Sequence, residues 1–167
     1  MGKELIEVIC GSGRGKTTMA IGQSLRAALE GKSVIIIQFL KGKERQQLDF
    51  LQDLEDLDVK IFRFEKMGCC YDNLTEQEKM EEQSNIMNGL HFARKVVATR
   101  ECDFLLLDEI LGLMDNGIAS EETIEEILKL KDEDMHIVLT GRELPVGLRG
   151  YVDSITTVTT EDLNDGN

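Results

Sequence analysis

Short apolar runs alternate with segments of helical periodicity along most of the chain. Residues 33–40 (SVIIIQFL) are β-branched and almost continuously apolar, which predicts a central strand covered on both faces. Residues 59–64 (VKIFRF) alternate between apolar and polar types, which favours a strand nearer the edge of a sheet. Further strands are predicted at 5–10, 104–107, 136–139 and 154–158.

The intervening segments predict helices with recognisable ends. One helix is expected over 16–30 and stops at Gly31. Thr75 followed three residues later by Glu78 is a capping-box pattern, and a long helix should run from there to about residue 100. Ser120 before two glutamates marks the start of another helix. The predicted inner faces consist of Met80, Met87, Leu90, Ala93 and Val97 on the long helix, and Ile124, Ile127 and Leu128 on the later one.

Strands separated by helices imply right-handed crossovers and a mainly parallel sheet. We therefore predict a three-layer α/β fold in one domain over residues 1–160. The single proline and the absence of a Ser/Gly linker argue against a second domain. Residues 161–167 are acidic and polar and are expected to form a frayed tail. Ligands of such sheets bind beyond the carboxyl ends of the strands.

A glycine-rich loop between the first predicted strand and helix carries the strongest chemical signal. We call residues 10–18 (CGSGRGKTT) the phosphate loop. Three glycines let backbone N–H groups curve around phosphate oxygens, the helix start favours an anion, and Lys16 and Thr17 supply a cation and a hydroxyl for Mg²⁺. The sequence departs from G-x-x-x-x-G-K-[ST] in having Cys10 at the first glycine position. The predicted nucleotide-binding residues here are Gly11, Ser12, Gly13, Arg14, Gly15, Lys16, Thr17 and Thr18.

Two carboxylates follow the apolar strand at 104–107, namely Asp108 and Glu109. In proteins with a phosphate loop, an acid at this place holds or orients the metal near the phosphates. We therefore predict Thr17, Asp108 and Glu109 as the residues that hold Mg²⁺. The two motifs together predict a nucleotide–Mg²⁺ site, but they do not identify the bond that is broken.

The formal net charge of −13 is unevenly distributed. Residues 1–66 carry 11 Lys and Arg against 10 Asp and Glu, whereas residues 67–167 carry 8 against 22. An anionic ligand should therefore bind to the first half, and nucleic acid and anionic membranes are disfavoured as partners. No run approaches a membrane span, and the four cysteines form no paired CxxC framework. We expect a soluble protein in a reducing, cytoplasmic compartment.

The phosphate loop resembles that of the ATP:corrinoid adenosyltransferases, the family that includes cob(I)yrinic acid a,c-diamide adenosyltransferase. The similarity continues in the LRAA segment around Arg26, in Q-F-L-K-G from Gln38, in L-D-E-I over 107–110, and in V-L-T-G-R ending at Arg142. Order and spacing agree across about residues 4–160. The resemblance implies a RecA-like P-loop fold and transfer of the 5′-deoxyadenosyl group of ATP to the cobalt of a reduced corrinoid, with release of triphosphate.

The resemblance also implies roles for individual residues. Lys16, Arg26 and Glu109 would be catalytic, with Arg26 neutralising an outer phosphate. Gln38 and Arg142 would contact the nucleotide. The alternatives are a solvated helix position for Arg26 and structural hydrogen bonds for Gln38 and Arg142. The implied small molecules are ATP, Mg²⁺ and the corrinoid, with an electron donor for cobalt and a possible homodimer.

The family shields the lower face of the corrinoid with a loop that corresponds to residues 67–72 here. Gly68, Cys69 and Tyr71 are the expected corrinoid-binding residues, and Cys69 stands where a second aromatic residue is expected. Two alternatives therefore stay open. The chain could be a non-catalytic ATP-binding paralogue that has lost the corrinoid site, or a P-loop ATPase or small-molecule kinase.

Overall fold

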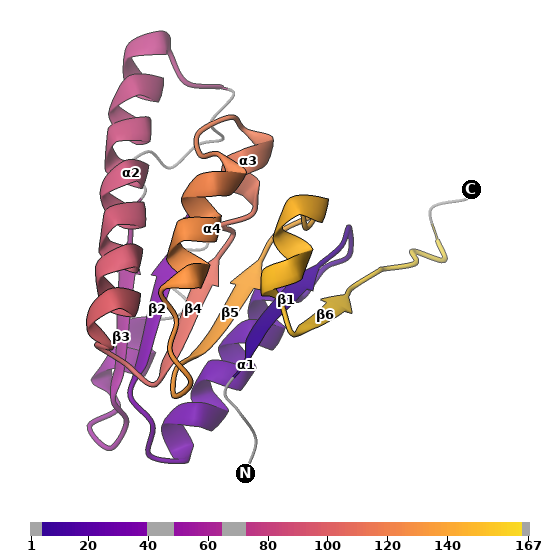
Figure 1. Ribbon diagram of the computed structural model, residues 1–167. Helices are drawn as coiled ribbons and strands as arrows, with labels where there is room; N and C mark the ends of the chain where they lie inside the picture. Colours follow the sequence, from indigo (N-terminus) through magenta and orange to yellow (C-terminus); the bar gives the residue numbers. More distant parts are fainter. Residues whose placement is uncertain (1–4, 40–48, 65–72, 165–167) are drawn as a thin grey trace.

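Six parallel strands form one sheet in a computed structural model that describes residues 5–39, 49–64 and 73–164 (Figure 1). The strand order is β3-β2-β4-β5-β1-β6. All neighbouring strands pair in parallel, as predicted, and the 59–64 segment forms an edge strand as expected. The strands are β1 (Ile6–Cys10), β2 (Val34–Gln38), β3 (Val59–Arg63), β4 (Phe104–Asp108), β5 (His136–Thr140) and β6 (Ser154–Thr157).

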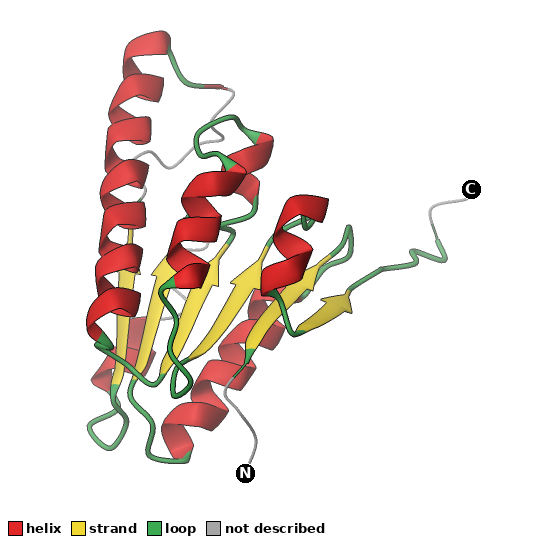
Figure 2. Cartoon of the chain, in the orientation of Figure 1, coloured by secondary structure: helices red, strands yellow, loops and turns green. Residues whose placement is uncertain are grey.

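Helices cover both faces of the sheet and make a three-layer α/β fold (Figure 2). One face carries α1 (Lys16–Leu29) and the short 3-10 helix η1 (Asp49–Asp53). The other face carries α2 (Glu76–Thr99), α3 (Gly112–Asp115), α4 (Glu121–Lys129) and the 3-10 helix η3 (Val146–Tyr151). This arrangement confirms the predicted fold class.

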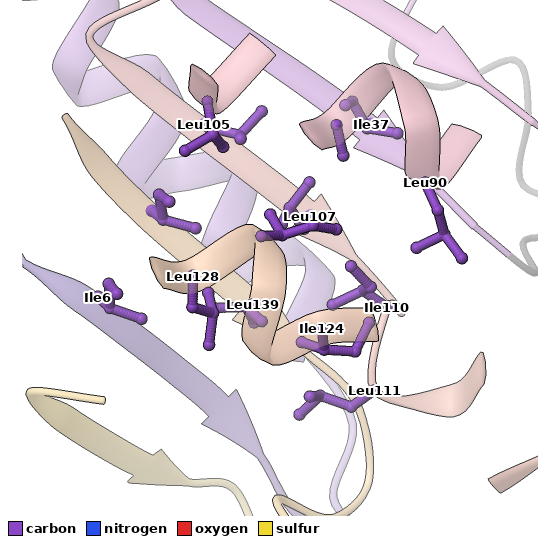
Figure 3. Packing of buried hydrophobic residues seen from close by; sticks show 14 of the residues in the cluster. Ile6, Ile37, Leu90, Leu105, Leu107, Ile110, Leu111, Ile124, Leu128 and Leu139 are labelled. Atoms are coloured by element: carbon purple, nitrogen blue, oxygen red, sulfur yellow. The ribbon is translucent and has the colours of Figure 1, made fainter. Parts of the chain in front are cut away.

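The core has two parts because side chains alternate between the faces of each strand. On β2, Ile35 and Ile37 pack under α2 and α4, whereas Val34 and Ile36 pack under α1. All five β2 residues are buried, which explains why this segment is almost continuously apolar. Figure 3 shows the larger cluster, which contains Leu90 and Ile124 from the helices and Leu107 from β4.

The predicted helix ends are confirmed. The Thr75 hydroxyl accepts a hydrogen bond from the Glu78 amide at 3.2 Å, and the Glu78 carboxylate accepts one from the Thr75 amide at 2.8 Å. Gly31, just beyond α1, has a φ of 85° that favours glycine. The Ser120 hydroxyl caps α4 by accepting from the amide of Thr123.

One expected core position is wrong. Met80, predicted on the inner face of the long helix, is 70% exposed, whereas Glu82 is buried. The first turns of α2 extend beyond the carboxyl edge of the sheet (Figure 1), so the apolar stripe has no strand to pack against there. Leu90, Ala93 and Val97, further along the helix, are buried as predicted.

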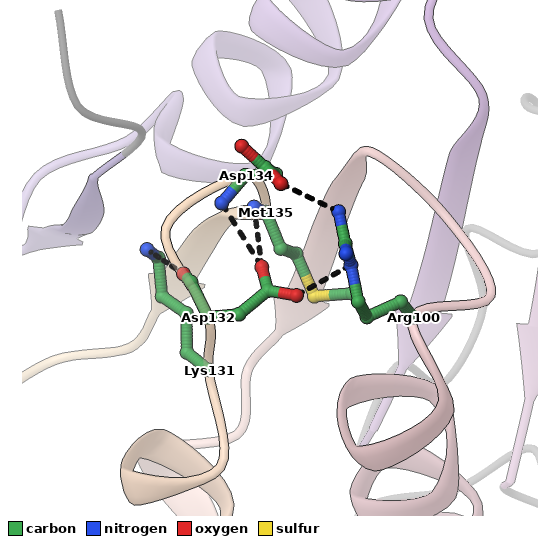
Figure 4. Close-up of polar contacts among 5 residues, drawn as sticks. All are labelled: Arg100, Lys131, Asp132, Asp134 and Met135. Carbon is green, nitrogen blue, oxygen red and sulfur yellow. Dashed lines mark hydrogen bonds and ion pairs between the residues drawn. The ribbon is translucent and has the colours of Figure 1, made fainter.

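At the amino ends of the strands, Arg100, the C-cap residue of α2, joins the end of that helix to the turn before β5 (Figure 4). Its guanidinium pairs with the carboxylates of Asp132 and Asp134. Asp132 in turn accepts from the amides of Asp134 and Met135 at 2.9 and 3.2 Å. This network fixes a connection far from the phosphate loop. Among the described residues, no helix is both long enough and apolar enough to cross a membrane.

Candidate functional site

The phosphate loop connects the carboxyl end of β1 to the start of α1. Gly15 is the N-cap of α1 with a φ of 96°, and no side chain caps this helix end. The Lys16 ammonium donates to the carbonyl oxygens of Gly11 and Gly13, each at 2.8 Å, so it lies inside the curve of the loop. A helix N-terminus with a lysine held in the preceding loop is a geometry that binds phosphate.

Gly11 and Gly13 must be glycines because the backbone of residues 158–159 lies directly against them. The amide of Gly13 donates to the carbonyl of Val158 at 2.9 Å, and the amide of Val158 donates to the carbonyl of Cys10 at 2.7 Å. A Cβ on Gly11 or Gly13 would collide with the backbone of residues 158–159. Gly15, by contrast, has open space and needs glycine only for its positive φ. All three glycines were predicted to contact phosphate, and this second requirement could not be predicted from the sequence, because it depends on the distant segment 158–159.

Arg14 points its side chain at the segment after β6. Its guanidinium makes a two-pronged ion pair with Asp162, at 2.6 and 3.1 Å, and its amide donates to the Thr160 hydroxyl at 2.8 Å. The carboxylate raises the pKa of Arg14 above its ordinary value. Arg14 is therefore part of the phosphate loop, but both its amide and its side chain are bound to the segment after β6.

Asp108 is fully buried at the end of β4 and accepts hydrogen bonds from three neutral donors. The Thr17 hydroxyl donates to Oδ1 at 2.9 Å, the Thr140 hydroxyl donates to Oδ1 at 2.8 Å, and the Gln38 amide donates to Oδ2 at 3.2 Å. The structure therefore brings together Thr17 and Asp108, two of the predicted Mg²⁺ residues, and adds Gln38, which was predicted as a nucleotide contact. In this arrangement Asp108 orients the hydroxyl of Thr17.

Gln38 makes structural hydrogen bonds of the kind considered as its alternative, and its contact with the nucleotide stays a prediction. Its side chain is 6% exposed and lies between Asp108 and Arg63, whose Nε donates to Gln38 Oε1 at 3.1 Å. Arg63 and Thr140 are further residues of this group that the motifs did not predict. The alternation of side chains along each strand places Arg63 and Thr140 on the face of the sheet that α1 covers. This pattern can be read from the sequence, but the order of the strands, which brings the residues next to each other, cannot.

Glu109 follows β4 in the left-handed region, with a φ of 63°. Its amide donates to the Thr140 hydroxyl at 2.8 Å, and the residue is half-buried. A non-glycine residue in this conformation occurs where the surroundings impose it, and such positions are common in functional sites. The structure therefore places the two predicted acids differently, one buried in the sheet and one at its carboxyl edge.

Arg26 is not brought to the phosphate loop. It lies in the last turn of α1, and ten residues of helix separate it from Lys16 by about 15 Å. Its side chain is 84% exposed and pairs with Glu30 in the next turn. This is the solvated helix position considered as its alternative, so a contact with an outer phosphate on the same chain is not retained.

The remaining predicted residues divide between the loop and its surroundings. Ser12 and Thr18 are exposed, in the loop and the first turn of α1. Arg142 is exposed just beyond β5, and its carbonyl accepts from the Gly11 amide at 2.8 Å, which is a structural hydrogen bond. The predicted corrinoid residues, Gly68, Cys69 and Tyr71, lie outside the described residues.

The donor set suits a hard cation. Thr17, Asp108 and Glu109 offer hydroxyl and carboxylate oxygens, which Mg²⁺ prefers, and nucleotide-bound Mg²⁺ needs only one or two protein ligands besides phosphates. Over residues 5–39, 49–64 and 73–164, no group of three or more His, Cys, Asp or Glu side chains gathers to hold a metal ion without such help. Cys102 is no candidate nucleophile, because burial raises the pKa of its thiol to about 12.

Comparison with known proteins identifies relatives over most of the chain. A family model described as ATP:corrinoid adenosyltransferase BtuR/CobO/CobP matches residues 2–162. The corrinoid adenosyltransferase of Escherichia coli K12 is 26% identical over 138 residues, which cover 83% of this chain and 67% of that protein. The corrinoid adenosyltransferase CobA of Salmonella typhimurium is 25% identical, over 91% of this chain and 74% of its own length.

Among solved structures, a KaiC-like protein from Pyrococcus horikoshii superposes with a TM-score of 0.64 at 17% sequence identity. The match covers 99% of this chain and 76% of that protein. At this identity the likeness concerns the fold alone, and it shows the RecA-like P-loop fold that the sequence resemblance implied.

Proposed function

The chain belongs to the ATP:corrinoid adenosyltransferase family, and on this basis we propose that it transfers the 5′-deoxyadenosyl group of ATP to the Co(I) centre of a corrinoid. Co(I) donates its electron pair to the ribose C5′ and forms the cobalt–carbon bond. The bond from C5′ to the triphosphate oxygen breaks, and triphosphate leaves with that bond's electrons. The observation that carries the proposal is the phosphate loop with Lys16 in its curve, inside the range that the family model matches.

The difficulty of this reaction lies in its leaving group. Co(I) is a strong nucleophile, whereas triphosphate is highly charged and must be stabilised as it departs. The Lys16 ammonium and the amides at the start of α1 supply positive charge where the loop curves. A phosphate that enters this curve would take over the hydrogen bonds that the lysine now gives to Gly11 and Gly13.

Mg²⁺ would be held by Thr17 and Glu109, with Asp108 keeping the Thr17 hydroxyl in place. When bound there, the ion would share the charge of the triphosphate. The corrinoid and an external electron donor for cobalt are further parts of the proposal, as are a homodimer and a cytoplasmic location. Cys10 and Cys102 are free and buried, which fits a reducing compartment.

A second candidate function is nucleotide binding without adenosyl transfer. The observation that favours it is Cys69 in the segment where the family resemblance leads us to expect a second aromatic residue. A P-loop ATPase or kinase is less well supported, because Asp108, one of the two acids after β4, is fully buried and already accepts hydrogen bonds from Thr17 and Thr140.

One assay distinguishes the three functions. The protein is incubated with ATP, Mg²⁺ and chemically reduced cobalamin, and both the cobalt–carbon product and the phosphate products are measured. Adenosylcobalamin together with triphosphate is the expected result. ADP and phosphate would instead indicate an ATPase or kinase. ATP binding with no product would indicate the non-catalytic paralogue and would overturn the proposed transfer.

A further inference from the structure

Four side chains form one polar row across the carboxyl edge of the sheet, on the face that α1 covers. Arg63 ends β3, Gln38 ends β2, Asp108 ends β4 and Thr140 ends β5. Gln38 lies in register with Arg63 on one side and with Asp108 on the other. Hydrogen bonds connect the row from Arg63 to Asp108, and Thr17 joins it from α1.

The row fixes the orientation of the Gln38 amide. A guanidinium can only donate hydrogen bonds and an ionised carboxylate can only accept them. Gln38 must therefore turn its oxygen towards Arg63 and its NH₂ group towards Asp108. Without Arg63, Gln38 Oε1 would lose its donor, and the side chain would be anchored only through its NH₂ group on Asp108.

The orientation of Asp108 matters because its other oxygen holds Thr17. Oδ1 accepts from Thr17 and Thr140, while Oδ2 accepts from Gln38. A carboxylate anchored on both oxygens holds the Thr17 hydroxyl in one orientation. Groups that hydrogen-bond to a metal ligand hold it in place, and their removal typically lowers metal affinity severalfold or more.

We propose that Arg63 is a positioning residue for the Mg²⁺-binding side of the nucleotide site, acting through Gln38 on Asp108 and Thr17. The inference rests on the nucleotide-binding part of the proposed function and not on adenosyl transfer. On this proposal, Arg63 contributes to the affinity for ATP only when Mg²⁺ is present. The binding of phosphate by Lys16 and the loop amides does not depend on it.

The test is ATP binding measured by calorimetry with Mg²⁺ and again with EDTA. Arg63→Met should weaken binding roughly threefold to tenfold in Mg²⁺, the range for one lost hydrogen bond, and leave binding in EDTA unchanged. Lys60→Met is the matched control, because it removes one positive charge from an exposed position on the same strand. It should alter neither measurement.

A double-mutant cycle tests the route through Gln38. Gln38→Met should produce the same selective loss, and the variant with both substitutions should bind no more weakly than Gln38→Met alone. Arg63→Lys should restore part of the Mg²⁺-dependent affinity, since lysine can still donate to Gln38 Oε1. Binding in EDTA serves in every variant as the measure that the loop is folded.

Three results would overturn the proposal. They are an equal loss in Mg²⁺ and EDTA, additive losses in the double variant, and a parent protein whose ATP affinity does not depend on Mg²⁺. A parent that binds Mg²⁺ and ATP as expected but yields no adenosylcobalamin would overturn the transfer reaction and leave the role of Arg63 standing. The two proposals therefore fail separately.

Discussion

Lys16 is the residue on which nucleotide binding depends most directly. Its ammonium is held by two loop carbonyls, which keeps the charge at the place where phosphate would bind. We expect Lys16→Ala to weaken ATP binding by at least about tenfold, because a charge-assisted hydrogen bond is lost. Calorimetry would show this, with Lys60→Ala as the control. Undiminished affinity would contradict the assignment of the phosphate loop.

Gly11 and Gly22 make a matched pair for the effect of an added methyl group. Gly11 has a φ of 118° and lies against the backbone of Val158, whereas Gly22 lies in α1 with nothing within 4 Å of an added Cβ. Gly11→Ala should destabilise the protein by roughly 1–3 kcal/mol. Gly22→Ala should stabilise it by about 0.5–1 kcal/mol. Urea denaturation of both variants tests the pair, and equal changes would contradict the close approach at Gly11.

Individual residues show how much of the candidate site could be predicted from the sequence. The motifs predicted Thr17 and Asp108 at one Mg²⁺ site, but the hydrogen bond between them comes from the structure. The link from Gln38 to Arg63 did not follow, since it depends on β2 and β3 lying side by side in a particular register. The predicted contact of Arg26 with an outer phosphate is not supported, for a geometric reason. The motif similarity gives the position of Arg26 in the sequence, but α1 places it far from the phosphate loop.

At the scale of elements, the N-terminal end of α2 depends on its capping box. Thr75→Ala removes the hydroxyl that accepts from the Glu78 amide, and we expect a loss of about 1 kcal/mol in the free energy of unfolding. Denaturation in urea at neutral pH would measure it. Gln77→Ala is a comparison, because that side chain is exposed in the first turn of α2 and does not cap the helix. An equal loss there would argue against capping as the cause.

The same cap gives α2 a defined pH dependence. The hydrogen bond from the Thr75 amide lowers the pKa of Glu78 below its ordinary value. A lowered pKa in the folded state means that the ionised carboxylate stabilises the fold. The contribution is complete above the ordinary glutamate pKa and disappears as pH falls through the lowered value. Glu78→Gln should therefore cost stability at neutral pH and little in acid, as measured by denaturation at both.

Elements also differ in how far their burial could be predicted. The inner face of α4 followed from spacing, since Ile124, Ile127 and Leu128 are all buried. The first turns of α2 carry the same type of pattern, yet Met80 is exposed there. Periodicity identifies a helix face, but only the position of the helix relative to the sheet determines whether that face is covered.

At the scale of the whole molecule, residues 158–162 return to the phosphate loop near the other end of the chain. They accept from the amides of Gly13 and Arg14 and pair with the Arg14 guanidinium. A chain that ends at Thr157 should lose these contacts and bind ATP about tenfold more weakly, whereas a chain that ends at Leu163 should bind normally. Hydrogen exchange at the Gly13 and Arg14 amides provides the direct measurement. Unchanged protection in the shorter chain would contradict the contact.

The sequence by itself determined the elements, the parallel α/β class and the chemistry of the loop and of the acids after β4. These follow from local periodicity, capping residues and short motifs, which act within a few residues of one another. Only the tertiary structure decided the strand order, the approach of residues 158–159 to Gly11 and Gly13, and the row from Arg63 to Thr140. The physical reason is that each of these depends on which distant segments pair, and pairing is set by burial of the whole sheet between its helices.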